Sequence, residues 1–365
     1  MVGSARWLRG VLALLIVAGT IGLGAAPGPA AQAAPAERAL SAPAGGPAPQ
    51  LTRVQFGSPQ SISDAGVFIG KAWGFFQAQG LDVDPVLFQS GPNLIAPLAS
   101  GDLEVGGGSF STGLLNAIDR GLALKMVADK GTSRPGFEFS QLLPRRELVD
   151  SGQVRTLADL RGKRIAVAST RSGAEAIAHQ VLLQGGVGID EVNLVELGYP
   201  DQLVAFANGG IDAAVIIEPS MTAAVARGLA APWDLGYSSV AYGGAYQAGV
   251  LLYGGRFAEQ TDLARRFMVA YLQGVRAYND AFVKGQRRDE VVRLLTEATA
   301  VKDPALYDQM QMAGLDPDGR LARQSLQIEY DYFRERGYYT GATTLDNVID
   351  TSFAEAAVQT LGPYR

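Results

Sequence analysis

The chain contains no cysteine and only one histidine, His179, among its 365 residues. Without cysteine there can be no disulfide framework, zinc finger, iron–sulfur cluster, thiolate nucleophile or lipid-bearing N-terminal cysteine. With one histidine, a Ser-His-Asp triad or a histidine-rich metal site would have to be built around His179 alone. We therefore expect no metal and no cofactor, and we expect hydroxyls, carboxylates, arginines and backbone amides to do the polar work.

Positive charge is also in short supply. The sequence has 31 Lys and Arg residues against 36 Asp and Glu residues, a formal net charge of −5, and its basic residues form no cluster. This balance argues against nucleic acid as the partner. The hydrophobic content of 47% over this length is enough for the cores of two domains.

The N-terminus has the composition of an export signal. Residues 1–33 carry two arginines, then an apolar run at 11–23, then the small-residue sequence Ala31-Gln32-Ala33. An apolar run this short does not comfortably cross a bilayer, so we predict that residues 1–33 are a cleaved signal peptide. The Ala- and Pro-rich residues 34–50 cannot bury enough surface to become ordered, so we expect a flexible leader there.

A repeat with an offset of 108 residues relates 91–105 to 199–213. Each copy reads as a short helix closed by glycine and followed by a small apolar strand, and each is preceded by a strand, a helix and a second strand. The alternation β–α–β–α–β in each half predicts two parallel sheets with helices on both faces. Chance similarity is the alternative, and the shared order of elements argues against it. The matched pairs include Pro92 and Pro200, Gly101 and Gly209, and Glu104 and Asp212.

The spacing of apolar residues indicates where further helices lie and to which lobe they belong. A helix is expected over 66–80, and helical spacing dominates from Glu259 to the C-terminus. These late helices need a sheet to cover, so we assign them to the first lobe. Our domain prediction places lobe 1 at 51–135 and 245–365, and lobe 2 at 136–244.

Four parts of the sequence resemble a known family. They are ISDAGVFIGKAWGFFQAQGLDVDPV, LASGDLEVGGGSFSTGLLNAIDRGLALKMVA, TLADLRGKRIAVASTRSGAEAI and the pair Glu218-Pro219. They are similar to the substrate-binding proteins of ABC importers, above all to the branch for aliphatic sulfonates, nitrate, taurine and the thiamine-pyrimidine precursor. The resemblance extends from about Leu51 to the end of the chain. It implies an α/β, two-lobed periplasmic-binding-protein fold of type II, in which each lobe is a mostly parallel sheet flanked by helices and two crossovers join the lobes.

The same resemblance implies a function. The protein would capture a small-molecule solute between its lobes by hinge closure and deliver it to an ABC permease in the inner membrane with its ATPase. With a cleaved signal and no lipid-anchoring cysteine, we expect a periplasmic monomer. One related branch uses a cysteine-rich motif with a histidine, and that chemistry does not transfer to a chain without cysteine. We therefore predict that the protein is not an enzyme; the alternatives are an enzyme on the same scaffold or a ligand-sensing partner of a membrane receptor.

Ligands of parallel sheets bind beyond the carboxyl ends of the strands, which predicts a cleft site between the lobes. In lobe 1 the loop after the first strand offers Ser63 and Asp64, which could also cap the next helix. The next loop offers Ser90 and Gly91, where glycine allows a close backbone approach.

The third loop of lobe 1 has three hydroxyls where a helix begins. Ser109, Ser111 and Thr112 bring hydroxyls and free backbone amides together, a suitable receptor for a carboxylate or a sulfonate. A single hydroxyl would be enough for plain helix capping, so we favour a ligand contact here.

The matching loop of lobe 2 presents Thr170, Arg171 and Ser172, and the guanidinium could hold an anionic group. Tyr199 is a candidate wall for a flat ligand, as are three tyrosines in the segment 237–246. Glu218 could pair with a ligand amine or with Arg171. We therefore expect an anionic or zwitterionic organic solute, and Arg171 and Glu218 together in the cleft would favour the zwitterion.

Overall fold

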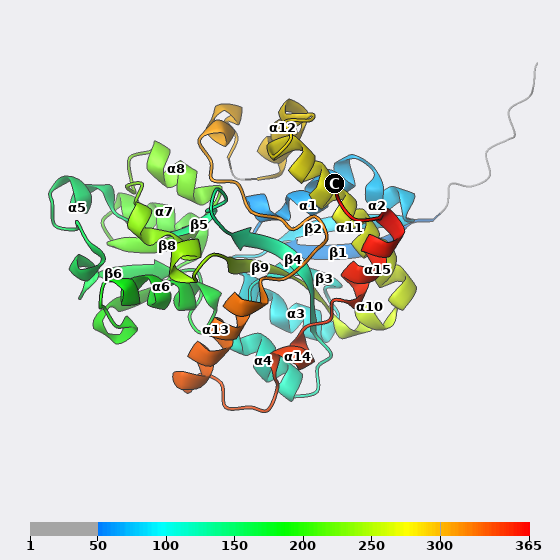
Figure 1. Cartoon of the computed structure of the whole chain (residues 1–365), viewed down its shortest axis with the longest axis horizontal. Helices are drawn as coiled ribbons and strands as arrows, with labels where there is room; N and C mark the ends of the chain where they lie inside the picture. The colour runs from blue at the N-terminus through cyan, green and yellow to red at the C-terminus, as the bar shows by residue number, and fades with distance from the viewer. Residues whose placement is uncertain (1–49, 300) are drawn as a thin grey trace, which may run out of the picture. The chain divides into compact units, whose positions relative to one another are not determined.

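Strands in the computed structural model, which describes residues 50–299 and 301–365, gather into two sheets that define two lobes. Lobe 1 has the strand order β2-β1-β3-β9-β4, with β1 Thr52–Ser58, β2 Leu81–Leu87, β3 Val105–Gly108, β4 Lys125–Ser133 and β9 Tyr246–Tyr253. Lobe 2 has the order β5-β8-β6-β7, with β5 Ser140–Pro144, β6 Arg164–Val167, β7 Asn193–Glu196 and β8 Ala213–Ile217. Figure 1 shows the two sheets side by side, with lobe 2 in green at the left.

The two sheets are built on the same plan. In lobe 1, β1 pairs in parallel with β2 and β3, and β9 runs antiparallel to β3. In lobe 2, β6 pairs in parallel with β7 and β8, and β5 runs antiparallel to β8. The orders β2-β1-β3-β9 and β7-β6-β8-β5 therefore correspond strand for strand, and the β–α–β–α–β pattern predicted for each half is confirmed. Lobe 1 adds β4 beyond β9.

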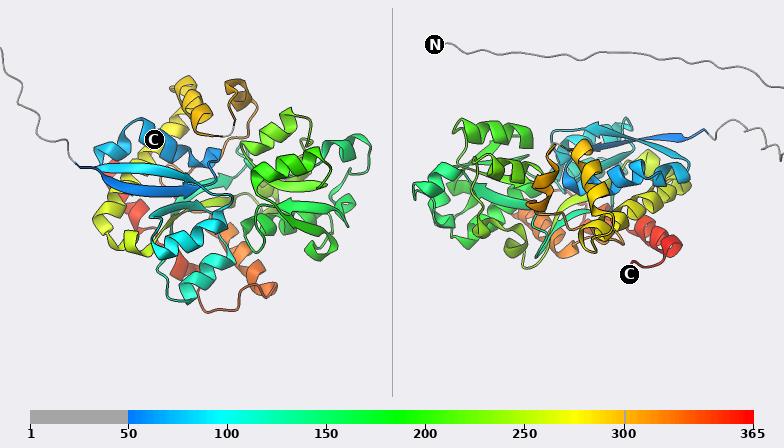
Figure 2. Two further views of the ribbon diagram at one scale, coloured as in Figure 1. Left: turned by 180° about the vertical axis from the view of Figure 1, so that it is seen from behind. Right: turned by 90° about the horizontal axis from the view of Figure 1, so that it is seen from above.

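Helices flank both sheets. Those of lobe 1 before its first crossover are α1 Ala65–Ala72, α2 Phe75–Ala78, α3 Ile95–Ser100 and α4 Thr112–Asp119. Those of lobe 2 are α5 Arg146–Asp150, α6 Gly173–Gln184, α7 Tyr199–Ala207, α8 Ser220–Ala226 and α9 Ser238–Ala241. Both views in Figure 2 place the green elements of lobe 2 beside the blue and cyan elements of lobe 1. The prediction of a single helix over 66–80 is wrong. Gly74 has a φ of +73°, which ends α1 and separates it from α2.

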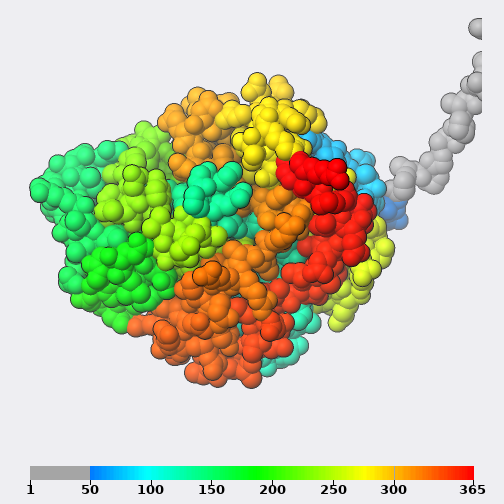
Figure 3. Space-filling model, in the orientation of Figure 1, coloured from blue at the N-terminus to red at the C-terminus, as the bar shows by residue number. Residues whose placement is uncertain are grey.

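The C-terminal helices follow β9. They are α10 Gly255–Glu259, α11 Thr261–Phe282, α12 Arg288–Ala298, α13 Arg323–Glu335, α14 Leu345–Val348 and α15 Ser352–Leu361. The long helix α11 lies against α1 and α15, and its apolar residues Phe267, Tyr271 and Tyr278 are buried in the lobe 1 core. Helix α13 contacts both β9 and α6, so it touches both lobes. Figure 3 shows α13 to α15, in orange and red, crossing the face in view.

A buried carboxylate holds the two crossovers together. Asp129 of β4 is 1% exposed and accepts hydrogen bonds from Gly131 N at 2.9 Å, Asp316 N at 2.7 Å and the side-chain amide of Gln247. Because Gln247 lies at the start of β9, this contact joins the strand that leaves lobe 1 to the strand that returns. Burial raises the pKa of Asp129 to about 6. Asp129 thereby fixes β4 and β9 relative to each other where the chain passes between the lobes.

The predicted signal peptide, and all of the predicted leader except Gln50, lie outside the described residues. Within the part of the chain that the structure describes, no helix has both the length and the apolar character needed to cross a membrane.

Candidate functional site

The carboxyl ends of the parallel strands of the two sheets face each other. The loop after β1 meets the loop after β8, where Ile62 N donates to the backbone oxygen of Glu218 at 3.4 Å. The loop after β2 meets the loop after β7, because a Cβ on Gly198 would lie 2.7 Å from the side-chain oxygen of Gln89. The loops after β3 and β6 also meet, as described next. The strand-end loops named from the sequence therefore lie along one interface between the lobes.

Two of these loops are joined by backbone hydrogen bonds, and we call this contact, formed by residues 110–112 and 171–173, the interlobe strap. Thr112 N donates to Arg171 O and Gly173 N donates to Phe110 O, both at 3.1 Å. The Thr112 hydroxyl adds a bond to Arg171 O at 3.2 Å. Ser111 and Ser172 pair across the strap.

The predicted anion receptors at the strap already have partners within the protein. Ser111 Oγ accepts from Leu114 N and Ser172 Oγ accepts from Ala174 N, each at 3.3 Å, so both serines cap their helices. Arg171 N donates to the carboxylate of Glu175 at 2.8 Å. The amides of Thr112, Leu114, Gly173 and Ala174 are thus engaged across the lobes or in caps.

A buried ion pair fixes the loop after β1. Lys130 Nζ lies 2.7 Å from Asp64 Oδ1 and donates to Ser63 Oγ at 2.9 Å, and the three side chains are buried. Removing one partner of such a pair typically costs about 3–5 kcal/mol, because it leaves the other charge buried alone. Sequence reasoning missed Lys130, because β4 also contains Lys125 and Asp129; the available signal was that a lysine in a strand needs a partner when it is buried. Lys130 therefore holds Ser63 and Asp64 together in the loop after β1.

Ser90 and Gly91 lie after β2, and Ser109 lies after β3, in the strand-end loops of lobe 1. Ser90 is buried at the start of the short helical turn Gly91–Leu94, and Ser109 is half-buried. A Cβ on Gly91 would lie 2.6 Å from Ser109 N, so the protein's own backbone approaches this glycine closely, and its contact with a ligand stays a prediction.

Arg171 and Thr170 bond to groups of the protein itself. The Arg171 guanidinium lies 5.3 Å from the ring centre of Tyr338, in the segment after α13, and the side chain is exposed. Thr170 donates through its amide and its hydroxyl to Glu196, at 2.9 and 2.8 Å. The structure therefore does not bring Arg171 and Glu218 together.

Glu218 is the fully buried carboxylate of the interface. Its Oε1 accepts from the Thr222 hydroxyl at 2.7 Å and from Gln311 N at 3.0 Å, and its Oε2 accepts from Thr222 N at 2.9 Å. Burial raises the pKa of Glu218 to about 7. Because Gln311 belongs to a segment packed on lobe 1, through Gly314 N and Thr132 O at 2.9 Å, this carboxylate also ties the lobes together.

A pocket of about 190 Å³ opens beside Glu218, and we call it the Glu218 pocket. Its lobe 2 walls are β5, α8 and the segment 232–237, which contributes Trp233 and Tyr237; the opposite wall is Gln309 and Gln311. Of the three candidate tyrosines in 237–246, Tyr237 lines this pocket, whereas the other two are buried in the lobe 2 core. No sequence signal pointed to the other lining residues, because they come from segments far apart in the chain.

Tyr199 begins α7 and is half-buried against the lobe 2 core. Burial raises the pKa of its phenol. A larger hollow of about 470 Å³ lies on lobe 1, between residues 318–323 and α15. It contains none of the strand-end loops, so we place the candidate site at the interface rather than there.

Among the described residues, no group of three or more His, Cys, Asp or Glu side chains could hold a metal ion. His179 stacks on Tyr332 with 4.6 Å between ring centres, and burial lowers its pKa. A buried acid also lies next to the strap: a Cβ on Gly173 would be 3.1 Å from a carboxylate oxygen of Glu329, which is fully buried on α13.

Comparisons with known proteins agree with this architecture. A Bacillus subtilis (strain 168) protein, provisionally named an aliphatic sulfonates-binding protein, is 29% identical over 178 residues, which are 47% of this chain and 50% of that protein. The alkanesulfonate-binding protein SsuA from Xanthomonas axonopodis pv. citri, bound to MOPS, superposes with a TM-score of 0.66 at 21% identity, over 84% of this chain and 99% of its own. The periplasmic nitrate-binding protein NrtA from Synechocystis PCC 6803 gives a TM-score of 0.66 at 14% identity, over 87% and 90%.

The structural likenesses confirm the predicted two-lobed periplasmic-binding-protein fold. The chain spans about half the length, or less, of the curated relatives it matches. The family model described as NMT1/THI5 like matches residues 61–281. Because that match covers more than half of the chain, the protein belongs to the NMT1/THI5-like family.

Proposed function

We propose that the protein is an exported, periplasmic solute-binding protein of an ABC importer, which captures a small organic solute between its lobes and delivers it to a membrane permease. The observation that carries the proposal is the meeting of strand-end loops from both sheets along one interface. The family and the binding proteins among its relatives support it.

The mechanism we propose is hinge closure. A ligand shifts an open–closed balance only by its difference in affinity for the two states, so it must touch both lobes. The interlobe strap supplies a few hydrogen bonds, each worth roughly 1 kcal/mol net. Because these contacts are weak, a solute that adds its own contacts to both lobes can shift the equilibrium from the open to the closed state.

For the charge of the solute, we propose the zwitterionic alternative over a simple anion. Arg171 lies against Tyr338, and Lys130 at the β1 loop is paired with Asp64. Glu218 brings a carboxylate to the same interface. We further propose that the protein acts by binding, as a monomer, without turnover of the solute.

The proposal is tested by ligand-induced stabilisation and closure. The exported protein is screened by thermal shift with sulfonates, aromatic carboxylates, pyrimidines and amines, since a ligand of the native state raises the melting temperature. X-ray scattering then measures the radius of gyration with the strongest stabiliser. We expect compaction on binding, and mass spectrometry should recover the solute unchanged.

A pair of matched variants assigns the closure to the strap. Thr112→Val removes the hydroxyl bond to Arg171 O, whereas Thr360→Val makes the same change on α15, where the hydroxyl bonds Ala356 O within the helix. We expect the first to weaken solute binding two- to fivefold and the second to leave it unchanged. A stabiliser that produces no compaction, or whose affinity is equal in both variants, would overturn hinge closure. Chemical conversion of the solute would overturn binding without catalysis.

A further inference from the structure

The Glu218 pocket has walls from both lobes. Its lobe 2 side consists of β5, α8 and the segment 232–237, and Gln309 and Gln311 close it from the segment packed on lobe 1. Trp233 is 9% exposed, whereas Asp234 and Gln309 are exposed and mark the mouth. A molecule in this pocket would touch both lobes, which is the requirement for a ligand that drives closure.

The size of the pocket limits the solute. A cavity of about 150 Å³ is enough to hold benzene. The 190 Å³ of the Glu218 pocket therefore fits one ring, or a branched body of similar size, together with a small polar substituent.

The charge of the pocket is one-sided. Its lining residues include two acids, Glu218 and Asp234, and neither a lysine nor an arginine is among them. A third acid, Glu138, is 5% exposed directly behind the wall, where its carboxylate accepts from Ser239 N at 3.3 Å. Above about pH 7, where Glu218 and Glu138 are ionised, an anion in this pocket would meet like charges and no counter-charge, so the pocket disfavours it.

The pocket also offers acceptors for N–H groups. A carboxylate has about four acceptor positions, and Glu218 receives three donors, of which only Thr222 N reaches Oε2. The side-chain amide of Gln141 donates to Glu138 O at 3.2 Å, which leaves its oxygen as an acceptor. Both residues line the pocket.

Aromatic walls complete the arrangement. Trp233 and Tyr237 line the pocket, and the Tyr237 hydroxyl donates to Asp234 Oδ1 at 2.8 Å, which holds the ring and the acid together at the mouth. Aromatic faces beside acids attract ammonium groups through the ring quadrupole as well as through charge.

We propose that the Glu218 pocket binds a small organic ammonium group, the amine end of a zwitterion included, with a body of about one ring. This inference rests on the proposed function, which it deepens by naming the chemical class of the solute. Glu218 and Gln141 accept the N–H groups, and Trp233 and Tyr237 hold the body and the positive charge. The strap amides of Thr112, Leu114, Gly173 and Ala174 take no part, because each already donates to an acceptor within the protein.

The test uses probes of one size and different charge. Calorimetry measures the binding of benzylammonium, benzyl alcohol, benzoate and benzenesulfonate to the exported protein. We expect benzylammonium to bind at least tenfold more tightly than benzyl alcohol, and the two anions to bind more weakly than the alcohol. Benzoate or benzenesulfonate binding as tightly as benzylammonium would overturn the assignment.

Variants then assign the preference to the pocket. Glu218→Gln should weaken benzylammonium about tenfold and change benzyl alcohol by less than twofold. The control Glu147→Gln removes the same charge on α5, where the side chain is exposed, and should change neither. Should Glu218→Gln disturb the fold, Trp233→Leu supplies an independent test, with an expected fivefold loss of benzylammonium binding. Equal effects of Glu218→Gln and Glu147→Gln would overturn the proposal.

The outcome separates this inference from the proposed function. A solute whose binding compacts the protein and depends on Thr112, but is unaffected by Glu218→Gln and Trp233→Leu, would overturn the pocket and leave the solute-binding function standing. Binding of benzylammonium that depends on Glu218 without compaction would uphold the pocket and overturn hinge closure.

Discussion

The two lobes follow the same path through their sheets and differ where the strands end. By the offset of 108 residues, which the strand pairing also follows, Phe110 after β3 in lobe 1 corresponds to Glu218 after β8 in lobe 2. At this position lobe 1 has a buried aromatic ring and lobe 2 has a buried carboxylate. The two halves of the repeat share their strand order, whereas the residues that follow the strands differ in polarity between the lobes.

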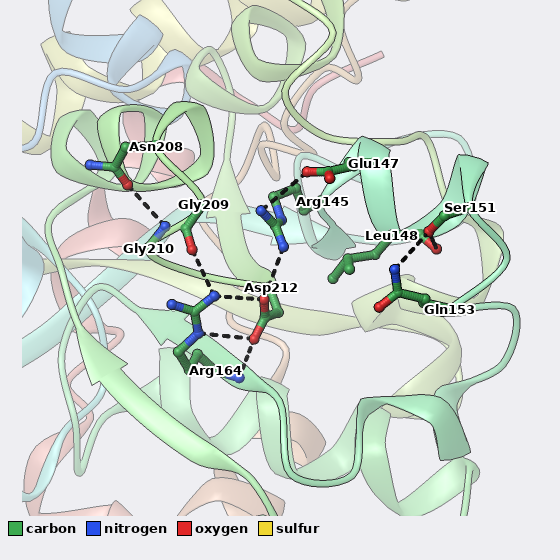
Figure 4. A network of polar contacts seen from close by, with 10 residues as sticks. All are labelled: Arg145, Glu147, Leu148, Ser151, Gln153, Arg164, Asn208, Gly209, Gly210 and Asp212. Carbon is green, nitrogen blue, oxygen red and sulfur yellow. Dashed lines mark hydrogen bonds and ion pairs between the residues drawn. The ribbon is translucent and has the colours of Figure 1, made fainter.

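The acid that precedes each of these strands shows what the repeat preserved. Glu104 accepts from Gln55 N of β1 at 2.8 Å, and Asp212 accepts from Arg164 N of β6 at 2.9 Å. In both lobes the acid therefore holds the backbone of the neighbouring strand. In lobe 2 two guanidinium groups join it: Arg164 at 2.8 Å and Arg145 at 3.3 Å from Asp212 Oδ1, as Figure 4 shows.

The largest difference that we expect between the lobes comes from neutralising these acids. Asp212→Asn leaves two partly exposed arginines beside a neutral amide and weakens several charge-assisted hydrogen bonds, and we expect it to lower the free energy of unfolding by about 2.5 kcal/mol. Glu104→Gln keeps an oxygen that can accept from Gln55 N, and we expect a loss of about 0.5 kcal/mol. Urea denaturation of both variants measures the difference.

Adding Arg164→Met to Asp212→Asn gives a double-mutant cycle for the network. If the arginines cause the asymmetry, the double variant should be more stable than the sum of the two single losses implies. Equal losses for Asp212→Asn and Glu104→Gln would show that the two acids have only their shared backbone role.

The next effect concerns the carboxylate that lobe 2 places at the interface. Glu218 has a folded-state pKa of about 7, above the ordinary 4.5, because it is buried. Between these values the folded state binds more protons than the unfolded chain, so stability falls as pH rises from about 4.5 to about 7. We expect Glu218 to contribute a loss of about 2 kcal/mol over this window. Glu138, with a pKa of about 7, and Asp129, with a pKa of about 6, act in the same direction.

Urea midpoints between pH 4.5 and pH 8 test this expectation. The curve for Glu218→Gln should be flatter than that of the unaltered chain across the window, whereas the curve for the exposed Glu147→Gln should run parallel to it. Parallel curves for all three proteins would show that Glu218 titrates in the folded state much as it does in the unfolded chain.

The sequence predicted the fold well, because the fold depends on signals that recur locally. Apolar strands, glycine-closed helices and a 108-residue repeat predict two α/β units, and the structure has them. The break at Gly74 was missed because helices tolerate an isolated glycine, so this residue alone did not predict that the helix ends. The domain limits, drawn at 135 and 245, remain a prediction.

The candidate site was predicted less completely. The loops were found because parallel strands place their carboxyl ends at one edge of each sheet. The partners of those loops were not found, because Lys130, Gln141 and Gln311 reach the interface only through tertiary packing. The same packing places Arg171 against Tyr338, which no local pattern indicates.

The smallest difference in stability between the lobes is expected from substituting the two glycines that end α3 and α7. Gly101 and Gly209 occupy the same place in the repeat, after α3 and α7, with φ values of +77° and +70°. An alanine there is strained in the left-handed region, so each Gly→Ala change should cost about 1 kcal/mol. The atoms nearest to the added Cβ belong to the flexible ends of arginine side chains, Arg256 in lobe 1 and Arg145 in lobe 2. Urea denaturation should give losses equal within about 0.5 kcal/mol; a larger loss for Gly209→Ala that disappears in the Asp212→Asn background would mean that Arg145 couples this turn to the lobe 2 network.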